Sequence, residues 1–262
     1  MTPSRRHWHE YAMEAALLGL FMIAACGFAT LLEHPASPAH RALPDGSVRR
    51  FLMGIAMGLT AIGLIYSPWG QQSGAHMNPS LTVTFFRLGK MGRGDALGYV
   101  VGQFVGGVLG VLLMRMAVGM LVAHPAVRFA ATAPGPGGTA RAFVAEFTIS
   151  FVLMAAVLVA SNSARLARYT PLLAGSLVAT YITVEAPISG MSMNPARSFA
   201  SALAAWQWTD LWIYFTAPPL GMLAAAEAYV RLRGAHRVLC AKLDQRTTRR
   251  CIFRCRYAAL GA

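Results

Sequence analysis

Six apolar segments, separated by polar loops, constrain the fold of this 262-residue chain more than any other feature. As helices, each is about long enough to cross a hydrocarbon core of about 30 Å, some only with help from flanking residues. Backbone amides find no water in that core, so each segment is predicted to be a transmembrane helix. The segments cover residues 12–32, 51–67, 96–122, 142–160, 171–186 and 211–230.

The composition agrees with a surface that faces lipid. Hydrophobic residues make up 56% of the chain and charged residues 13%, whereas a soluble domain carries about a quarter charged residues. A basic start followed by an apolar run is also typical of a signal peptide. However, residues 12–32 are long enough to span and no convincing small-residue cleavage site follows them, so we expect a retained first helix.

The distribution of positive charge predicts the orientation in the membrane. An even number of spans places both termini on one side, and Lys and Arg concentrate on the cytoplasmic side. With the N-terminus inside, the inner segments hold Arg5, Arg6, Arg87, Lys90, Arg93, Arg165, Arg168 and the C-terminal tail, and the outer ones hold Arg41, Arg49, Arg50, Arg128 and Arg141. We therefore expect a multi-pass protein of the cell membrane (inner or plasma membrane) with both termini cytoplasmic.

The formal net charge of +13 comes mostly from the C-terminal tail. Nine of the 23 Lys and Arg residues lie in residues 231–256, where Asp244 is the acidic residue that opposes them. Such a segment suits contact with anionic lipid headgroups. We expect this role rather than binding of nucleic acid.

The same tail holds three of the four cysteines. Cys240, Cys251 and Cys255 share it with His236, but their spacing lacks the paired CxxC of zinc knuckles. Cys26 lies inside the first apolar run, where a thiol behaves as a small hydrophobe. The sequence therefore predicts reduced thiols, no metal site and no cofactor.

A repeated motif divides the chain into two halves. Residues 73–80 read SGAHMNPS and residues 189–196 read SGMSMNPA, with five of eight positions identical. Each motif follows two apolar spans and precedes a third, and Glu14 in the first span matches Glu146 in the fourth. The match extends to Asp95, Tyr99 and Gly106 in the third span, which correspond to Asp210, Tyr214 and Gly221 in the sixth. Three spans per copy invert the second copy, and the functional site of such a repeat lies at the midplane.

Each motif opens a segment that is too short to span, residues 78–88 and 194–205. Asn is a favoured N-cap, and Pro at the first helical position loses no intrahelical hydrogen bond, so each segment is predicted to be a half-helix. The positive ends of both helix dipoles would point at the centre. There Asn78 and Asn194 would donate to an oxygen acceptor, and the dipoles would oppose a cation.

On these motifs, the paired glutamates and Gln103, the chain resembles the aquaporin and glycerol-facilitator family, the major intrinsic proteins, with bacterial-type aquaporins as the nearest form. The resemblance implies an all-α membrane protein of six transmembrane helices plus two half-helices in an inverted three-helix repeat. The implied division is a cytoplasmic N-terminal tail at 1–11, a channel domain at 12–231 with repeats of about 12–122 and 140–231, and a basic cytoplasmic C-terminal tail at 232–262.

The resemblance also assigns roles around a pore. The two boxes are Asn78, Pro79, Ser80 and Asn194, Pro195, Ala196, with Ser80 where the family usually has Ala. A selectivity filter is expected at Met57 (or Gly58), Ile182, Met191 and Arg197. Backbone carbonyls of Gly74, Ala75, His76, Gly190, Met191 and Ser192 would line the pore, and Glu14, Glu146 and Gln103 would support its loops.

The implied function is passive conduction of water, with small uncharged solutes, and exclusion of protons and ions. Arg197 would donate to a passing oxygen and repel cations. Met57 and Ile182 stand where strict water channels usually carry Phe and His, so the filter is predicted to be more apolar. Ser198 stands where glycerol facilitators usually carry Asp. The phrase SGMSMNPARS is similar to plant and bacterial members that also pass glycerol and metalloid acids, so a glycerol, urea or metalloid-acid facilitator with little water selectivity is the alternative.

Two other classes of protein are weighed against the channel, a secondary transporter and an enzyme. A proton-coupled secondary transporter also uses inverted repeats and broken helices, but it often shows coupling carboxylates that face the cavity. Enzyme activity is not expected, because no nucleophile elbow or HExxH motif occurs.

The family is typically homotetrameric, and small residues of the third span fit tight helix contacts, namely Gly102, Gly106, Gly107 and Gly110.

Overall fold

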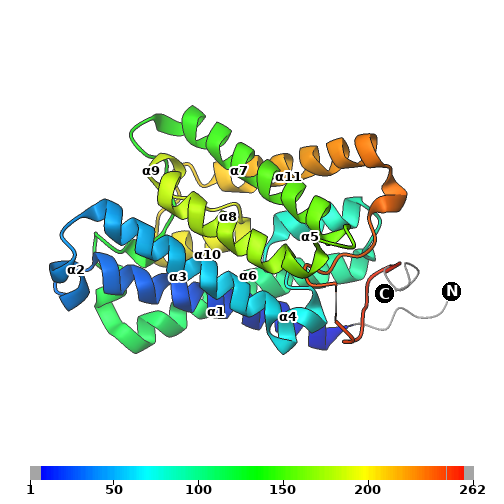
Figure 1. Cartoon of the computed structure of the whole chain (residues 1–262). Helices are drawn as coiled ribbons and strands as arrows, with labels where there is room; N and C mark the ends of the chain where they lie inside the picture. The colour runs from blue at the N-terminus through cyan, green and yellow to red at the C-terminus, as the bar shows by residue number, and fades with distance from the viewer. Residues whose placement is uncertain (1–6, 246, 257–262) are drawn as a thin grey trace.

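The computed structural model describes residues 7–245 and 247–256, and helices without any strand form this part of the chain. Its six long helices are α1 (Trp8–Glu33), α3 (Gly46–Tyr66), α6 (Arg93–Val118), α7 (Gly138–Ser161), α8 (Thr170–Val184) and α11 (Trp212–Arg233). The two half-helices are α5 (Pro79–Arg87) and α10 (Pro195–Ala205). Short helices join them: α2 (Pro38–Ala42), α4 (Pro68–Ser73) and α9 (Ala186–Ser189). Figure 1 shows the long helices packed side by side as one elongated bundle.

The predicted all-α fold with six spans and two half-helices is therefore confirmed. Among the described residues, α1, α3, α6 with its 3-10 extension to Ala123, and α7 are long and apolar enough to cross a membrane. Helix α8 has 15 residues and ends two residues before the predicted boundary. The short helix α9 begins at Ala186, after Glu185 as the intervening residue.

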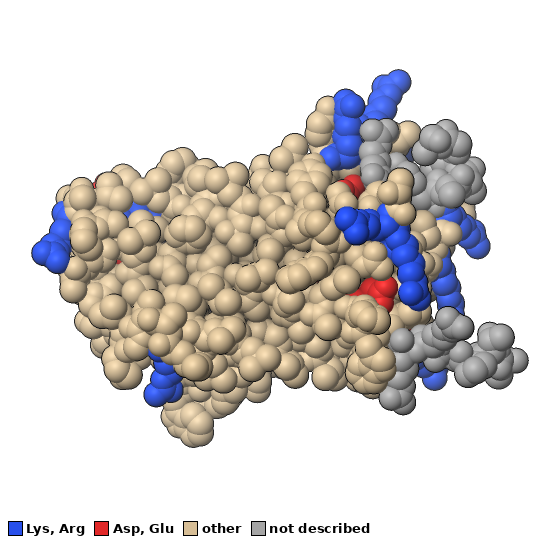
Figure 2. All heavy atoms as spheres, turned by 90° about the horizontal axis from the view of Figure 1, so that it is seen from below, with Lys and Arg blue, Asp and Glu red and all other residues tan. Residues whose placement is uncertain are grey.

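The sides of the bundle suit a hydrocarbon environment. Leu97, Val101, Val105 and Leu109 are exposed at four-residue spacing on α6, so they form one apolar stripe. Figure 2 shows Lys and Arg gathered at the two ends of the molecule, most densely at the end that carries the tail, with a nearly uncharged surface between them. We call the end that carries residues 238–245 and 247–256 the inner end, and the opposite end the outer end.

The helices pack with an approximate two-fold relation between the halves. The most extensive contacts join α1 to α6, α7 to α11, and α3 to α8. Under the sequence repeat, α1 corresponds to α7, α3 to α8 and α6 to α11. The α1–α6 contact therefore corresponds to the α7–α11 contact, and the α3–α8 contact corresponds to itself. The packing thus follows the repeat that the motifs predicted.

Glycines set the closest of these contacts. A Cβ on Gly106 would overlap the carbonyl oxygen of Ala15, and one on Gly221 would overlap that of Phe147, at the matching place in the second half. Between α3 and α8 the relation is reciprocal, because a Cβ on Gly58 would lie 2.7 Å from the Gly175 oxygen and one on Gly175 would lie 2.6 Å from the Gly58 oxygen. The pseudo-two-fold axis therefore passes between these two glycines.

The glycines of the third span pack within the chain. Gly102 faces the Tyr11 backbone, Gly106 faces Ala15, Gly110 faces Gly19, and Gly107 lies near Ala200. These contacts account for the small side chains without a second subunit. The homotetramer therefore stays a prediction from the family resemblance alone.

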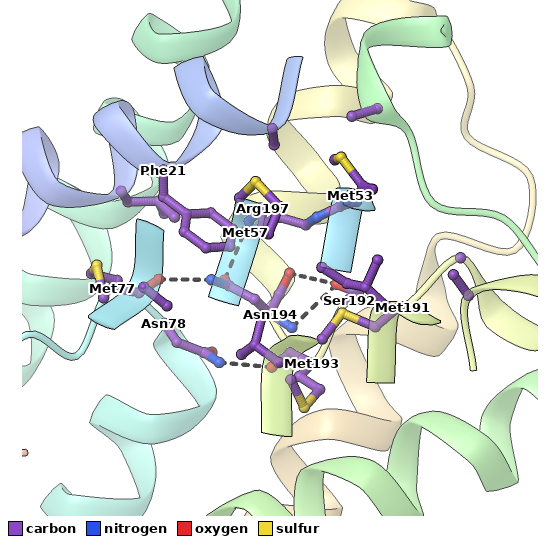
Figure 3. Close-up of a pocket in the computed structure, with 18 of the residues that line it drawn as sticks. Phe21, Met53, Met57, Met77, Asn78, Met191, Ser192, Met193, Asn194 and Arg197 are labelled. Atoms are coloured by element: carbon purple, nitrogen blue, oxygen red, sulfur yellow. Dashed lines mark hydrogen bonds between the residues drawn. The ribbon is translucent and has the colours of Figure 1, made fainter. Parts of the chain in front are cut away.

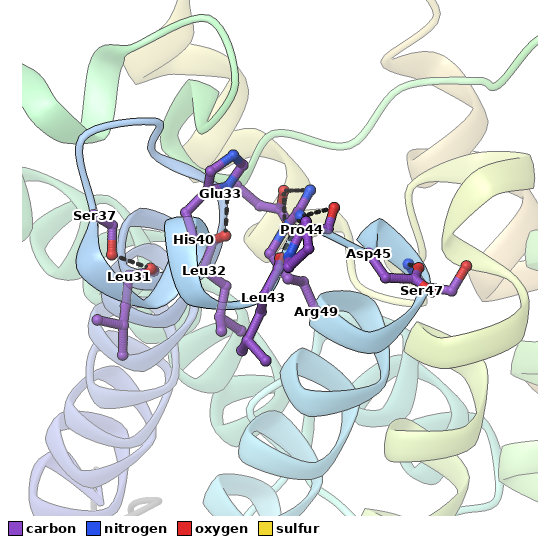
Figure 4. Close-up of polar contacts among 10 residues, drawn as sticks. All are labelled: Leu31, Leu32, Glu33, Ser37, His40, Leu43, Pro44, Asp45, Ser47 and Arg49. Carbon is purple, nitrogen blue, oxygen red and sulfur yellow. Dashed lines mark hydrogen bonds and ion pairs between the residues drawn. The ribbon is translucent and has the colours of Figure 1, made fainter.

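The outer connection between α1 and α3 is held by a compact set of polar contacts (Figure 4). Arg49 pairs with Glu33 through Nε at 3.2 Å and donates from Nη1 to the carbonyl oxygens of Leu43 and Pro44. The His40 ring lies 3.0 Å from the Leu32 oxygen. These contacts fix the outer ends of α1 and α3.

The helix contact at Gly106 predicts a measurable loss of stability. Gly106→Ala should lower the melting temperature of the purified protein in detergent, because the added methyl group forces α1 and α6 apart at a cost of about 1–3 kcal/mol. Gly63→Ala is the matched control, since nothing lies within 4 Å of a Cβ there. Equal melting temperatures for both variants would contradict the close packing of α1 and α6.

Candidate pore

Two half-helices begin at the centre of the bundle, each with a capped first turn. Asn78 accepts from the Ser80 amide at 2.8 Å through its own Oδ1, and Asn194 accepts from the amides of Ala196 at 3.1 Å and Arg197 at 3.2 Å. Pro79 and Pro195 follow these caps as the first helical residues. The local chemistry of each Asn-Pro pair therefore starts each half-helix where the sequence places it.

The two caps are also joined to each other (Figure 3). Asn78 Nδ2 donates to the carbonyl oxygen of Met193 at 2.7 Å, and Asn194 Nδ2 donates to that of Met77 at 2.7 Å. A carboxamide carries two N–H donors. Each asparagine thus holds the opposite loop with one N–H and keeps a second for an acceptor in the adjoining cavity, which both residues line.

The loops that lead to these caps share an unusual backbone. Gly74 and Gly190 have φ of 94° and 81°, as glycine readily adopts. Further left-handed positions are Ala75 and Met77 in the first loop and Met191 and Met193 in the second, with φ between 49° and 55°. Non-glycine residues adopt this conformation at a cost, so the surrounding structure must hold it.

Two buried carboxylates hold these loops. Glu14 accepts from the amides of His76 at 2.9 Å and Met77 at 2.6 Å, and from the Ser73 hydroxyl at 2.7 Å. Glu146 makes the matching set with the amides of Ser192 and Met193, both at 2.7 Å, and with the Ser189 hydroxyl at 2.6 Å. Both glutamates have 0% exposed surface, so these bonds replace the water that the carboxylates lose.

Further supports complete each half. Gln103 donates to Glu14 at 2.8 Å and to Thr82 at 3.1 Å. The Tyr99 hydroxyl donates to the Ser73 carbonyl, and the Tyr214 hydroxyl donates to the Ser189 carbonyl. The sequence analysis gave neither tyrosine a role. Their correspondence in the repeat was the signal that could have identified them.

A cavity of about 470 Å³ runs along the bundle axis past both asparagines. Its lining extends from Glu33 and Arg50 at the outer end to Leu243 at the inner end. The predicted wall residues Ala75, His76, Gly190, Met191 and Ser192 all line it. Gly74 is not among the described lining residues, and its carbonyl accepts from the Leu243 amide at 3.2 Å. Pro79, Ser80, Pro195 and Ala196 are buried behind the caps.

The four residues of the predicted filter lie around this cavity. Met57, Ile182, Met191 and Arg197 all line it, and Figure 3 shows Met57 and Met191 near Arg197. Gly58, the alternative first position, instead packs against Gly175 and Ala179. Phe21, which the sequence analysis did not single out, also lines the cavity.

Arg197 presents a donor in this filter. Its Nη1 is buried and has no hydrogen-bond partner within the described part of the chain. A buried guanidinium donor without a partner is costly, so a polar solute that accepts from it gains binding energy.

An inverted helical repeat with two half-helices that meet beside a central cavity is an architecture of membrane transport proteins. The model of the family described as "Major intrinsic protein" matches residues 2–229, and the chain belongs to this family, which consists of channels rather than enzymes. It is 31% identical over 223 residues to "Aquaporin NIP1-1" of Arabidopsis thaliana, covering 84% of this chain and 72% of the relative. It is 30% identical over 219 residues to "Aquaporin NIP1-1" of Zea mays, covering 83% and 72%.

A solved structure shares the fold. The aquaglyceroporin from Plasmodium falciparum superposes with a TM-score of 0.70 at 17% sequence identity, over 84% of this chain and 94% of that one. At this identity the likeness concerns the fold.

The glutamate contacts predict unequal effects of two substitutions. Glu146→Ala leaves two loop amides and a hydroxyl without their acceptor, at about 1–3 kcal/mol each, so folded yield should fall strongly. Glu146→Gln keeps one acceptor oxygen but turns an N–H₂ toward another donor, so yield should fall less. Fluorescence-detected size-exclusion chromatography measures both, with exposed Glu227→Ala as the control. Yields that match this control for both variants would contradict a supporting role.

Proposed function

We propose that this protein is a passive pore that conducts water together with small uncharged solutes and excludes protons and ions. The observation that carries the proposal is the crossed asparagine pair inside a cavity that runs from the outer end to Leu243. A solute oxygen can accept from the remaining N–H of each asparagine, while carbonyls of the loops accept from its hydrogens. Such exchange replaces hydration without offering a charge.

Three features support exclusion of cations. The N-terminal ends of α5 and α10 place two positive dipole ends at the centre. Arg197 adds a formal positive charge to the cavity wall. Glu14 and Glu146 are absent from the described lining and accept from loop amides instead. Coupling carboxylates would have to face the solute, so this placement disfavours the proton-coupled transporter.

The filter favours solutes with carbon backbones beside water. Met57, Ile182 and Met191 offer apolar surface in the cavity that Arg197 also lines, and methionine side chains adapt their shape. Water loses hydrogen bonds in such a filter, whereas glycerol or urea gains apolar contact. The facilitator of glycerol, urea or metalloid acids with little water selectivity is therefore the second candidate function.

The membrane setting follows from the family and the apolar helices. We propose that the inner end faces the cytoplasm across a cell membrane, because Lys and Arg are denser there (Figure 2), and we keep the prediction that both termini are cytoplasmic. We further propose that residues 12–231 form the channel domain and that the protein assembles as a homotetramer.

Replacement of Ile182 tests the solute range. In proteoliposomes, wild-type protein should show water flux with detectable glycerol and urea flux by stopped-flow light scattering. Ile182→His adds bulk and a hydrogen-bonding group to the cavity that Arg197 lines, so glycerol and urea flux should fall several-fold more than water flux. Ile182→Leu keeps the volume and should change neither. Wild-type protein that passes water and fully excludes glycerol and urea would contradict the proposed filter.

Replacement of Arg197 tests ion exclusion. Arg197→Val removes a unit charge, which repels a cation 4 Å away by about 4 kcal/mol at an effective dielectric constant of about 20. Proton leak, followed with a pH-sensitive dye trapped in proteoliposomes, should rise at least about tenfold, and the half-helix dipoles should keep part of the barrier. The control is Arg115→Val on α6. A proton leak that equals wild type would show that Arg197 does not contribute to the barrier.

A further inference from the structure

The described part of the C-terminal tail, residues 238–245 and 247–256, lies across the inner end of the cavity. Figure 1 shows it returning from the end of α11 across the bundle. The Leu243 amide donates to the Gly74 carbonyl at 3.2 Å, and Leu243 itself lines the cavity. The Ala241 carbonyl lies 2.8 Å from Nε2 of His76, and the Phe253 ring stacks on the His76 ring at 5.5 Å and 9°. The tail therefore covers the loop that forms the inner mouth of the pore.

Contacts on three sides fix the tail in this place. The Leu239 amide donates to Oδ1 of Asn162 at 2.7 Å, which joins the tail to the end of α7. Gln71 of α4 donates to Asp244 at 3.2 Å. The Arg254 amide donates to the carbonyl of Lys90 at 3.0 Å, in the loop after α5. Residues 238–245 are buried as a result.

The tail has little secondary structure to maintain this shape. Beyond the 3-10 turn at Ala235–Arg237, the described residues up to 256 contain neither helix nor strand. Lys242 donates from Nζ to the carbonyls of Arg249 at 3.1 Å and Arg250 at 2.9 Å, and the Arg256 amide donates to the Leu239 carbonyl. An irregular segment with few backbone hydrogen bonds opens easily unless a cross-link constrains it.

Three cysteines meet at the point where the tail folds back on itself. The Sγ atoms of Cys240 and Cys251 are 3.5 Å apart, and those of Cys240, Cys251 and Cys255 all lie within 4.8 Å of one another. A tetrahedral zinc ion with Zn–S bonds of about 2.3 Å needs sulfurs about 3.8 Å apart. Cys240 is buried, whereas Cys251 and Cys255 are exposed, so an ion has access from solvent.

The charges around this cluster suit a cation held by thiolates. Three thiolates and a divalent ion carry a net charge of −1, which nearby ammonium groups offset. Lys242, two residues from Cys240, places its Nζ within hydrogen-bond distance of the carbonyls of Arg249 and Arg250, next to Cys251 in the sequence. Sulfur ligands select soft ions such as Zn²⁺ over Mg²⁺ and Ca²⁺.

We propose that Cys240, Cys251 and Cys255 bind one soft divalent cation of the Zn²⁺ class, with a water molecule as the fourth ligand, and that the bound ion holds the tail closed over the inner mouth. The thiol protons leave to solvent when the ion binds. The gating half rests on the proposed pore function, whereas the binding half does not. The sequence analysis expected no metal here, because the spacing of the three cysteines lacks the paired CxxC of zinc knuckles, whereas the fold of the tail brings the three Sγ atoms together.

Metal binding is tested on the purified full-length protein in detergent. One equivalent of Co²⁺ should give the intense near-ultraviolet band of thiolate ligation, and added Zn²⁺ should remove it. Cys251→Ser and Cys255→Ser should lower the affinity at least about tenfold, which corresponds to a loss of about 1.4 kcal/mol. Cys26→Ala, outside the cluster, is the control. Equal binding by all four proteins, or a Cys240–Cys251 disulfide found by mass spectrometry in protein kept in its cellular redox state, would overturn the site.

Tail closure is tested separately from conduction. Zn²⁺ should slow hydrogen exchange at the Leu243 amide at least about tenfold in wild-type protein, because the ion binds the closed tail preferentially, and should leave it unchanged in Cys251→Ser. Unchanged exchange in wild-type protein that binds one equivalent would overturn the role of the ion in closure.

Conduction then tests the gate itself. In proteoliposomes, Zn²⁺ on the tail side should lower wild-type solute flux, chelator should restore it, and a chain ending at residue 237 should conduct irrespective of Zn²⁺. If Zn²⁺ slows hydrogen exchange at the Leu243 amide but leaves wild-type solute flux unchanged, the proposed gating role of the tail is wrong. If the truncated chain conducts neither water nor glycerol, the proposed pore function fails, while the binding and exchange results still decide the metal site.

Discussion

The structure depends on how backbone N–H groups are satisfied where no water is present. The two loops that enter the bundle have irregular backbone, so their amides lack helical partners. Glu14 and Glu146 supply acceptors for these amides from α1 and α7. Their negative charge strengthens each hydrogen bond, and full burial keeps water from competing.

The other features of the pore follow from these two anchors. Loops held from behind can keep left-handed residues such as Met77 and Met193, whose carbonyls then receive the opposite asparagine. The asparagines in turn fix the start of α5 and α10 and the position of Arg197. A substitution of Glu14 or Glu146 should therefore alter the position of the filter residues, although neither glutamate lines the cavity.

The two halves are alike near the centre and differ at the ends. At the outer end, Gly190 lies against Thr132 and Ala133, which belong to the loop before α7. At the inner end, Gly74 lies against Lys242 and Phe253 of the tail. Under the repeat, the tail occupies the place of that outer loop. The difference matters because the outer loop continues directly into α7, whereas the tail is fixed by side-chain contacts that can be released.

The sequence by itself determined the features that depend on neighbours along the chain. Apolar length predicts the spans, Asn-Pro pairs predict the half-helices, and the odd number of spans per repeat predicts the inversion. Only the tertiary structure decided which residues from distant segments meet. It placed Met57 rather than Gly58 at the cavity, engaged the Gly74 carbonyl with the tail, and gathered Cys240, Cys251 and Cys255. The physical reason is that capping and hydrophobic length act locally, whereas side-chain packing and cross-chain hydrogen bonds depend on how whole helices approach one another.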